Sequence, residues 1–136
     1  MAVGYTRVNP DKVFAFATKV LEKNSVPHDE AEITARLLVD TDFRGIESHG
    51  IAHLAPFYIK RMKDGLINPK PNIKTWSDSA TSVAMDGDNG LGFVCGYKAM
   101  QEAMLRARIA GAGFVSIRNT THYGACSAYS LIFRWI

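Results

Sequence analysis

The sequence lacks the features that would place the protein in a membrane or in an oxidising compartment. No apolar run approaches the roughly 20 residues that a membrane-spanning helix requires, and the first residues, MAVGYTRVNPDK, contain no apolar signal core. The only two cysteines, Cys95 and Cys126, have neither the close pairing nor the histidine neighbours of a zinc site. We therefore predict a cytoplasmic protein with no membrane contact, in which both cysteines are reduced, small packed residues.

Runs of like charge are absent too. The 16 basic and 13 acidic residues are interspersed and leave a formal net charge of +3, so the chain has no basic arm or stripe that would bind a nucleic acid. It also has no internal repeat and no low-complexity segment. With 47% hydrophobic and 21% charged residues among 136, the composition is typical of one packed globular domain.

Three helices are predicted in the first part of the chain. Asn9-Pro10-Asp11 has the residue types of a helix start, and apolar residues at helical spacing follow to about Asn24. Acidic residues after Val26-Pro27 mark the start of a second helix that continues toward Phe43. A third helix is expected from Leu54 to Lys63.

The pattern changes after a proline-rich linker that ends near residue 72. Ile73 to Trp76 and Thr81 to Met85 predict a β-hairpin, and Asp86 to Gly90 predicts a turn-rich loop. A long helix is expected from about Gly92 to Gly111, and Phe114 to Arg118 predicts a buried strand. The fold class is therefore α/β, with a helical segment over residues 1–75 and the start of a sheet domain over residues 76–136.

The segment between the second and third helices has the densest group of polar side chains. His49 lies there between Ser48 and Gly50, and a histidine can exchange a proton near neutral pH. We therefore consider His49 a candidate general acid/base, with the Ser48 hydroxyl holding one ring nitrogen. The alternative is a histidine that caps a helix or packs in the core, and the tripeptide alone does not decide between them.

Other kinds of site are possible for the same residues. Ser48 and His49 are poor candidates for a nucleophile and its base, because adjacent residues seldom face each other and no nucleophile-elbow motif surrounds the serine. His49 and His53 have the spacing of two metal ligands on a helix but lack a clear carboxylate partner, so we expect no metal. His122 follows a predicted strand, where functional loops of α/β sheets commonly lie; otherwise it is a turn histidine bonded to the backbone.

A glycine fingerprint of the Rossmann or P-loop type is also missing. The segment from Asp88 to Gly92 precedes a helix and offers free backbone N–H groups, but it does not have the usual glycine spacing. Any nucleotide site in this chain is therefore expected to be unconventional.

Four segments, Asp42 to Ile51, Asp64 to Pro69, Asp86 to Met100 and Val115 to Gly124, occur in the order and at the spacing of one known family. Together they resemble the malate/L-lactate dehydrogenase family, which includes ureidoglycolate dehydrogenases and diketogulonate reductases. The resemblance extends over nearly the whole chain, to about Tyr129. Four collinear motifs carry far more weight than one.

The resemblance implies hydride transfer between NAD or NADP and a small 2-hydroxy or 2-keto acid. It implies a non-Rossmann fold with a mixed sheet, usually assembled as a homodimer. His49 would exchange the proton of the substrate hydroxyl, and Ser48 would orient it. By the same similarity His122 would lie beside the nicotinamide and the substrate, in a loop shaped by Asn119 and Thr120.

The chain departs from the family at the expected substrate carboxylate. Many relatives have an arginine four residues after the signature histidine, where its guanidinium grips the carboxylate with two parallel bonds, and this chain has His53 there. A histidine would bind a carboxylate more weakly, so we expect either a contribution from Arg44 or Arg61 beside His53 or a different substrate. A substrate-binding tyrosine on the following helix matches Tyr58, with Phe57 as the competing position.

Length is the second departure. Family members are considerably longer, and this chain stops at residues 130–136, inside an expected helix and with residues that do not resemble the family. We interpret the chain as the N-terminal portion of such a dehydrogenase. The alternative is a truncated, non-catalytic product that at most associates with a full-length subunit. In either case we expect an exposed sheet edge at Phe114, low stability and little activity for the isolated chain.

Overall fold

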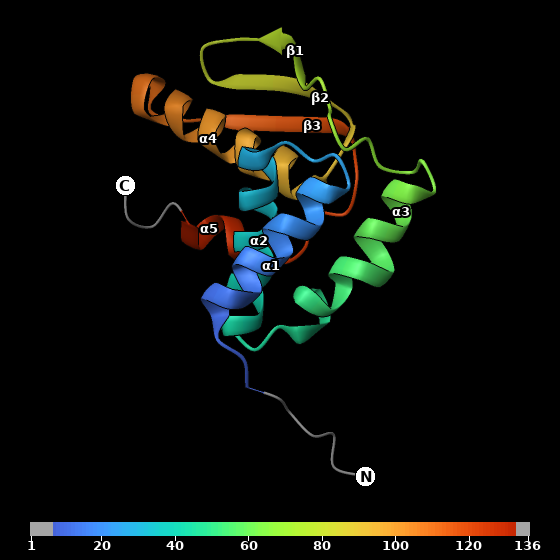
Figure 1. Ribbon diagram of the computed structural model, residues 1–136. Coiled ribbons are helices and arrows are strands. Elements are labelled where there is room, and N and C mark those ends of the chain that lie inside the picture. Colours follow the sequence, from blue (N-terminus) through green and yellow to red (C-terminus); the bar gives the residue numbers. More distant parts are fainter. Residues whose placement is uncertain (1–6, 133–136) are drawn as a thin grey trace.

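The structure, a computed structural model that describes residues 7–132, places a group of helices beside a three-stranded sheet (Figure 1). Helix α1 is Pro10–Lys23 and α2 is His28–Phe43, close to the predicted bounds. The Asn9 side chain accepts hydrogen bonds from the backbone N–H groups of Asp11 and Lys12, at 2.9 and 3.2 Å. It therefore caps α1 as its sequence position predicts.

The predicted third helix forms, but in an unusual geometry. Two short 3₁₀ turns, η1 (Glu47–His49) and η2 (Ile51–His53), lead into the π-helical turn η3 (Leu54–Ile59), which continues as α3 (Lys60–Lys63). A π-helical turn holds one more residue per hydrogen-bonded ring than an α-helix, and such turns occur frequently at functional sites. The sequence predicted the helical span and not this widening.

The sheet is mixed, as the family resemblance implied. Its strands are β1 (Lys74–Asp78), β2 (Ser82–Gly90) and β3 (Phe114–Thr120), in the order β1-β2-β3. Strands β1 and β2 are antiparallel, whereas β2 and β3 are parallel and joined by the crossover helix α4 (Gly92–Ala110). A short helix α5 (Cys126–Ile132) follows β3. No helix within residues 7–132, including α4, is long and apolar enough to cross a membrane.

The prediction of a loop from Asp86 to Gly90 is wrong, because β2 extends through it. The strand pairing is nevertheless irregular there, with a break in register between Asp86 and Gly90 and positive φ angles at Asp88 and Asn89. Turn-forming residues thus bend the strand without ending it, since its backbone still pairs with Thr120 of β3.

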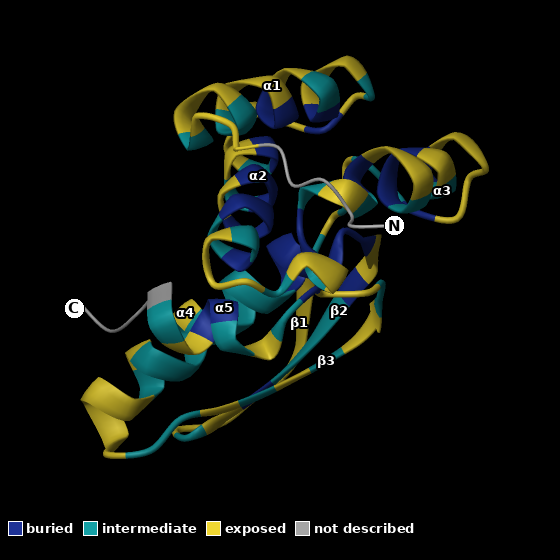
Figure 2. Ribbon diagram, turned by 90° about the horizontal axis from the view of Figure 1, so that it is seen from below, coloured by how far each residue is buried: buried dark blue, intermediate teal, exposed yellow. Residues whose placement is uncertain are grey.

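The core lies among the helices, and the sheet contributes little to it (Figure 2). The first turn of α4 enters this core, where Phe93 and Val94 are fully buried. The prediction of a buried strand from Phe114 to Arg118 is wrong, because β3 is an edge strand whose residues are exposed or half-buried. Its outer face has no covering layer within residues 7–132, and α4 covers the other face only in part.

The two cysteines differ in burial, as the helical core and the strand β3 do. Cys95 is buried in the first turn of α4, as predicted. Cys126 is exposed at the start of α5, with its Sγ 2.8 Å from the Tyr123 hydroxyl. The prediction that Cys126 is a packed residue is therefore wrong, because nothing among residues 7–132 covers that end of α5.

Candidate active site

Two histidines from distant parts of the sequence meet at the junction between the helices and the sheet. His49 comes from η1, and His122 comes from the loop that follows β3. Their rings are stacked, with centroids 5.5 Å apart and an angle of 29° between the ring planes. The fold therefore brings together His49, the predicted acid/base, and His122, which was expected beside the nicotinamide and the substrate.

Ser48 holds the ring of His49, and the backbone around it is held by an aspartate. The Ser48 hydroxyl lies 2.9 Å from His49 Nδ1, which leaves Nε2 for another partner. The backbone N–H of Ile51 donates to the Asp42 carboxylate at 2.8 Å. A Cβ at Gly50 would overlap that carboxylate, so any larger residue there would have to displace the Asp42 side chain from its bond with Ile51. The sequence motif contained Asp42, but no pattern indicated this role.

His122 is held through its Nδ1 atom. The Tyr58 hydroxyl lies 2.8 Å from Nδ1, and the backbone N–H of Gly124 donates to the same atom at 3.4 Å. Burial raises the pKa of Tyr58, which keeps the phenol protonated and able to donate. Because Nδ1 accepts both bonds, the proton of the neutral imidazole resides on Nε2.

The pKa of His122 is lowered from its ordinary value. The largest cause is burial, and the positive charges that His49 and His53 would carry when protonated act in the same direction. His122 is therefore the ring of the cluster held neutral near pH 7, and it presents an N–H donor at Nε2.

The π-helical turn places both Phe57 and Tyr58 against His122. The Phe57 ring centroid lies 5.6 Å from that of His122 and 6.3 Å from that of His53. Tyr58 is fully buried and also packs edge-on against Phe93 of α4, at 5.0 Å. Tyr58 thus supplies a hydrogen bond to His122, and Phe57 supplies an apolar contact to His122 and His53. The two residues that compete for the expected tyrosine position therefore have different roles.

His53 belongs to the same group. Its ring is half-buried, and its Nδ1 atom is buried with no hydrogen-bond partner among residues 7–132. An imidazole in this state leaves hydrogen-bonding capacity unused by the protein, which is uncommon for a buried polar atom. His53 shares the Phe57 ring with His122 and lowers the pKa of His122, and its role as a substrate ligand stays a prediction.

The loop that carries His122 is fixed on the start of α4. The backbone N–H of Gly92 donates to Thr121 Oγ1 at 3.1 Å, and Thr121 Oγ1 donates to the carbonyl oxygen of Gly90 at 3.0 Å. A Cβ at Gly92 would overlap the carbonyl oxygens of Thr121 and His122. Gly92 is therefore a positioning residue for the histidine loop that the sequence did not reveal.

Asn119 and Thr120 shape this loop from its other side and do not face the histidines. Asn119 has a positive φ of 49°, and its side chain donates to the Asp86 carboxylate at 2.9 Å. That carboxylate also accepts from Arg118 and from the backbone of Asp88, and these bonds lower the pKa of Asp86. Thr120 Oγ1 is buried close to the Cys95 thiol.

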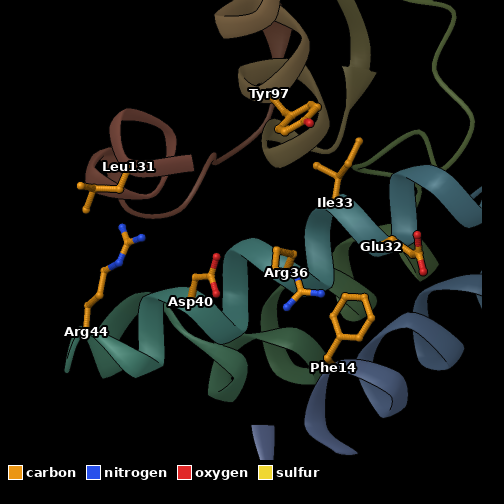
Figure 3. Close-up of a pocket in the computed structure, with 8 residues that line it drawn as sticks. All are labelled: Phe14, Glu32, Ile33, Arg36, Asp40, Arg44, Tyr97 and Leu131. Atoms are coloured by element: carbon orange, nitrogen blue, oxygen red, sulfur yellow. The ribbon is translucent and has the colours of Figure 1, made fainter. Parts of the chain in front are cut away.

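Arg44 is one of the two arginines expected near the substrate, but it borders a different cavity, which Figure 3 shows. Its guanidinium donates to the carbonyl oxygen of Ser127 at 3.0 Å, beside Leu131 of α5. It borders a separate cavity of about 520 Å³ whose lining residues are Phe14, Glu32, Ile33, Arg36, Asp40, Arg44, Tyr97 and Leu131. None of the histidines lines this cavity.

Arg61, by contrast, lies next to the histidine cluster. Its Cζ atom is 5.1 Å from the centroid of the Phe57 ring, the ring that touches both His53 and His122. The structure thus connects Arg61 to the histidines through the Phe57 ring, whereas Arg44 borders a different cavity.

Comparison with known proteins identifies a family and several relatives. The malate/L-lactate dehydrogenase family matches residues 8–133. The malate dehydrogenase of Pyrococcus abyssi is 41% identical over 128 residues, and the L-sulfolactate dehydrogenase of Methanocaldococcus jannaschii is 43% identical over 123 residues. These matches cover 94% and 90% of this chain but 35% and 36% of those relatives, so the chain spans about a third of their length.

The fold is shared as well. The crystal structure of malate dehydrogenase from Pyrococcus horikoshii superposes on this chain with a TM-score of 0.91 at 40% sequence identity, covering 94% of this chain and 36% of that one. The family match over residues 8–133 and the similarity of fold together show that the chain belongs to the malate/L-lactate dehydrogenase family.

Proposed function

We propose that this chain provides the proton-exchanging part of a dehydrogenase that moves a hydride between NAD or NADP and a small 2-hydroxy or 2-keto acid. The observation that carries the proposal is the stacked pair of His49 and His122, each held at Nδ1 by a hydroxyl group. Holding Nδ1 on both rings directs both Nε2 atoms to other partners. Family membership supports the reaction class, because the related proteins are malate and sulfolactate dehydrogenases.

The residues present fit a nicotinamide beside His122. An apolar groove of about 380 Å³ adjoins the histidine loop, and small residues of α4, Gly92 and Gly96 among them, form part of its lining together with Thr120 and Tyr123. A flat aromatic ring suits such a groove. Thr120 and the loop around His122 would hold the nicotinamide end, and the cofactor, when bound, supplies or accepts the hydride.

The protons are moved by the chain's own side chains. In oxidation, Nε2 of His49 takes the proton of the substrate hydroxyl; in reduction it returns that proton to the oxygen. Ser48 keeps the ring in one orientation through Nδ1. His122, neutral because of its lowered pKa, donates its Nε2 hydrogen to the same oxygen and stabilises the charge that develops there.

A second candidate function is a non-catalytic one, in which the chain associates with a full-length subunit. The observation that favours it is the open sheet, because β3 is an unpaired edge and Phe114 at its start is 66% exposed. Such edges pair readily with other chains. The homodimer implied by the family resemblance and the cytoplasmic location expected from the sequence stay predictions.

Binding and turnover measurements test the first proposal. The purified chain is titrated with NADH and NADPH by fluorescence, beside a form extended through any coding sequence that continues in frame, and both are assayed for reduction of 2-keto acids. We expect His49→Ala to lower the rate by roughly 10²- to 10⁴-fold, as for loss of a general acid/base. His28→Ala is the matched control, since His28 is an exposed histidine of α2 paired with Glu22.

The two candidates give different results. Cofactor binding and turnover that depend on His49 support the dehydrogenase. No cofactor binding in either form, together with association with a full-length subunit, supports the non-catalytic product.

A further inference from the structure

Arg61 is a partly buried arginine with no acceptor for its N–H donors among residues 7–132. Arg106 is the other partly buried arginine within residues 7–132. It forms ion pairs with Asp78 and Glu102, at 2.6 and 2.8 Å. A guanidinium carries five N–H donors, and taking it partly out of water without an acceptor costs free energy. The N–H donors of Arg61 are therefore not used by any acceptor among residues 7–132, and they can bind a ligand.

The helical spacing places the Arg61 side chain next to Phe57, the residue one turn before it. His53, Phe57 and Arg61 follow one another at intervals of four residues along η2, η3 and α3. Side chains on a helix lean toward its N-terminus, so Arg61 reaches back over the Phe57 ring and toward His53. The 5.1 Å between Arg61 Cζ and the Phe57 centroid fits a cation held against an aromatic face.

The histidine cluster needs a permanent positive charge if its substrate is an acid. His122 is neutral near pH 7, and His49 must lose its proton before it can act as a base. Within residues 7–132, Arg61 is the cation that stacks on a ring of this cluster, while the other two stacked arginines lie on Phe14 and Trp76. Arginine is the side chain type that supplies such a permanent charge.

The position of Phe57 decides which part of the substrate Arg61 can reach. The hydroxyl that reacts must lie at His49 and His122, and the adjoining carboxylate then lies near His53. Among residues 7–132, Arg61 contacts the Phe57 ring and has no hydrogen bond to the histidines, so we expect it to reach a group farther along the substrate.

We infer that Arg61 binds a second acidic group at the far end of the substrate, so that the site selects 2-hydroxy and 2-keto acids that carry two acidic groups. The inference rests on the proposed function. Malate and sulfolactate, named in two of the relatives, have such a second group, whereas lactate does not. Arg61 is thus a specificity-determining residue, with His53 at the position beside the reacting carbon.

Histidine ring signals in NMR spectra provide a test that does not need turnover. The full chain is titrated with L-malate and with L-lactate, and the shifts of His49 and His122 give a dissociation constant for each acid. We expect L-malate to bind on the order of tenfold to a hundredfold more tightly, the range of one charge-assisted hydrogen-bonded contact. Arg61→Gln should remove this preference and leave lactate binding unchanged, and Arg61→Lys should restore part of it.

Arg36→Gln is the matched control. Arg36 is also stacked on a phenylalanine, with its Cζ 4.3 Å from the Phe14 centroid, but it borders the cavity that holds no histidine. This variant should keep the full preference for L-malate. Thermal melting of each variant separates loss of binding from loss of fold.

The outcomes separate the inference from the function on which it rests. If both acids bind equally, or if Arg61→Gln weakens both to the same extent, Arg61 does not select a second acidic group, while the hydroxyacid site stands. If neither acid moves the signals of His49 or His122 in the unsubstituted chain, the proposed function fails at this site, and the inference fails with it.

Discussion

The helical region of this protein buries a much larger fraction of its apolar side chains than the sheet does. Helices α1 and α2 and the segment from η2 to α3 enclose a continuous core in which side chains such as Leu38 and Tyr58 are fully buried. In the three strands, Val83 is the one buried apolar side chain within residues 7–132. Buried apolar area is the main source of folding free energy, so the helical region contributes most of the stability.

This difference bears on the active site, which lies where the two regions meet. The well-packed helical region carries His49, His53 and Tyr58, whereas His122 belongs to the loop after the exposed strand β3. The bonds from Gly92 and Tyr58 tie that loop to the core. The histidine pair therefore depends on a few contacts that join a firm region to an open one.

The largest expected effect comes from removing apolar volume on each side of this comparison. Leu38→Ala should lower the free energy of unfolding by about 2–5 kcal/mol, because Leu38 is 0% exposed in the helical core. Ile109→Ala, at the 76% exposed end of α4, should change it by about 0.5 kcal/mol or less. Urea unfolding curves measure both, and equal losses would show that the end of α4 is as well packed as the helical core.

A methyl group at Gly50 should have the next largest effect. Gly50→Ala would press a Cβ onto the Asp42 carboxylate, with an expected loss of about 1–3 kcal/mol and a displaced His49. In Asp42→Ala/Gly50→Ala the overlap is gone, so the double variant should be more stable than the sum of the two single changes predicts. Strict additivity in a double-mutant cycle would contradict this account of Gly50.

Tyr58→Phe tests the bond that ties the loop to the core. Loss of the hydroxyl should cost about 1 kcal/mol of stability, and it should raise the pKa of His122, because the phenol donates to the neutral ring. The pKa is read from the NMR titration of the His122 ring. Tyr123→Phe is the control, since that hydroxyl contacts the exposed Cys126 and not His122; an equal rise in both variants would argue against the Tyr58 bond.

The smallest effect is a pH dependence of opposite sign at two histidines. The pKa of His122 is lowered below 6.5, so its contribution to stability is present above about pH 6.5 and is lost as the pH falls through the lower value of the folded state. The pKa of His28 is raised by its hydrogen bond to Glu22, so its contribution is present below pH 6.5 and is lost as the pH rises. Unfolding curves of His122→Gln and His28→Gln across pH 5 to 8 should change slope in opposite directions.

Local signals in the sequence were sufficient for most secondary structure. The cap at Asn9, the acidic residues after Pro27 and the glycine at 111, with its left-handed φ of 81°, mark helix ends that the structure confirms. Each of these signals acts within one turn of backbone, which is why it can be read without knowing the fold. Predicted burial failed at Phe114 and Cys126, because burial depends on what the rest of the chain places above a residue.

By itself, the sequence determined the helices, the α/β order and the identity of the histidines at 49 and 122, since propensity, capping and motif are properties of neighbouring residues. Only the tertiary structure decided which side chains share the site. It stacked the rings of His49 and His122, directed the Tyr58 hydroxyl to His122, and placed Arg61 rather than Arg44 against the Phe57 ring that touches His122. These choices depend on how the π-helical turn and the loop after β3 pack together in space, and no local pattern encodes that packing.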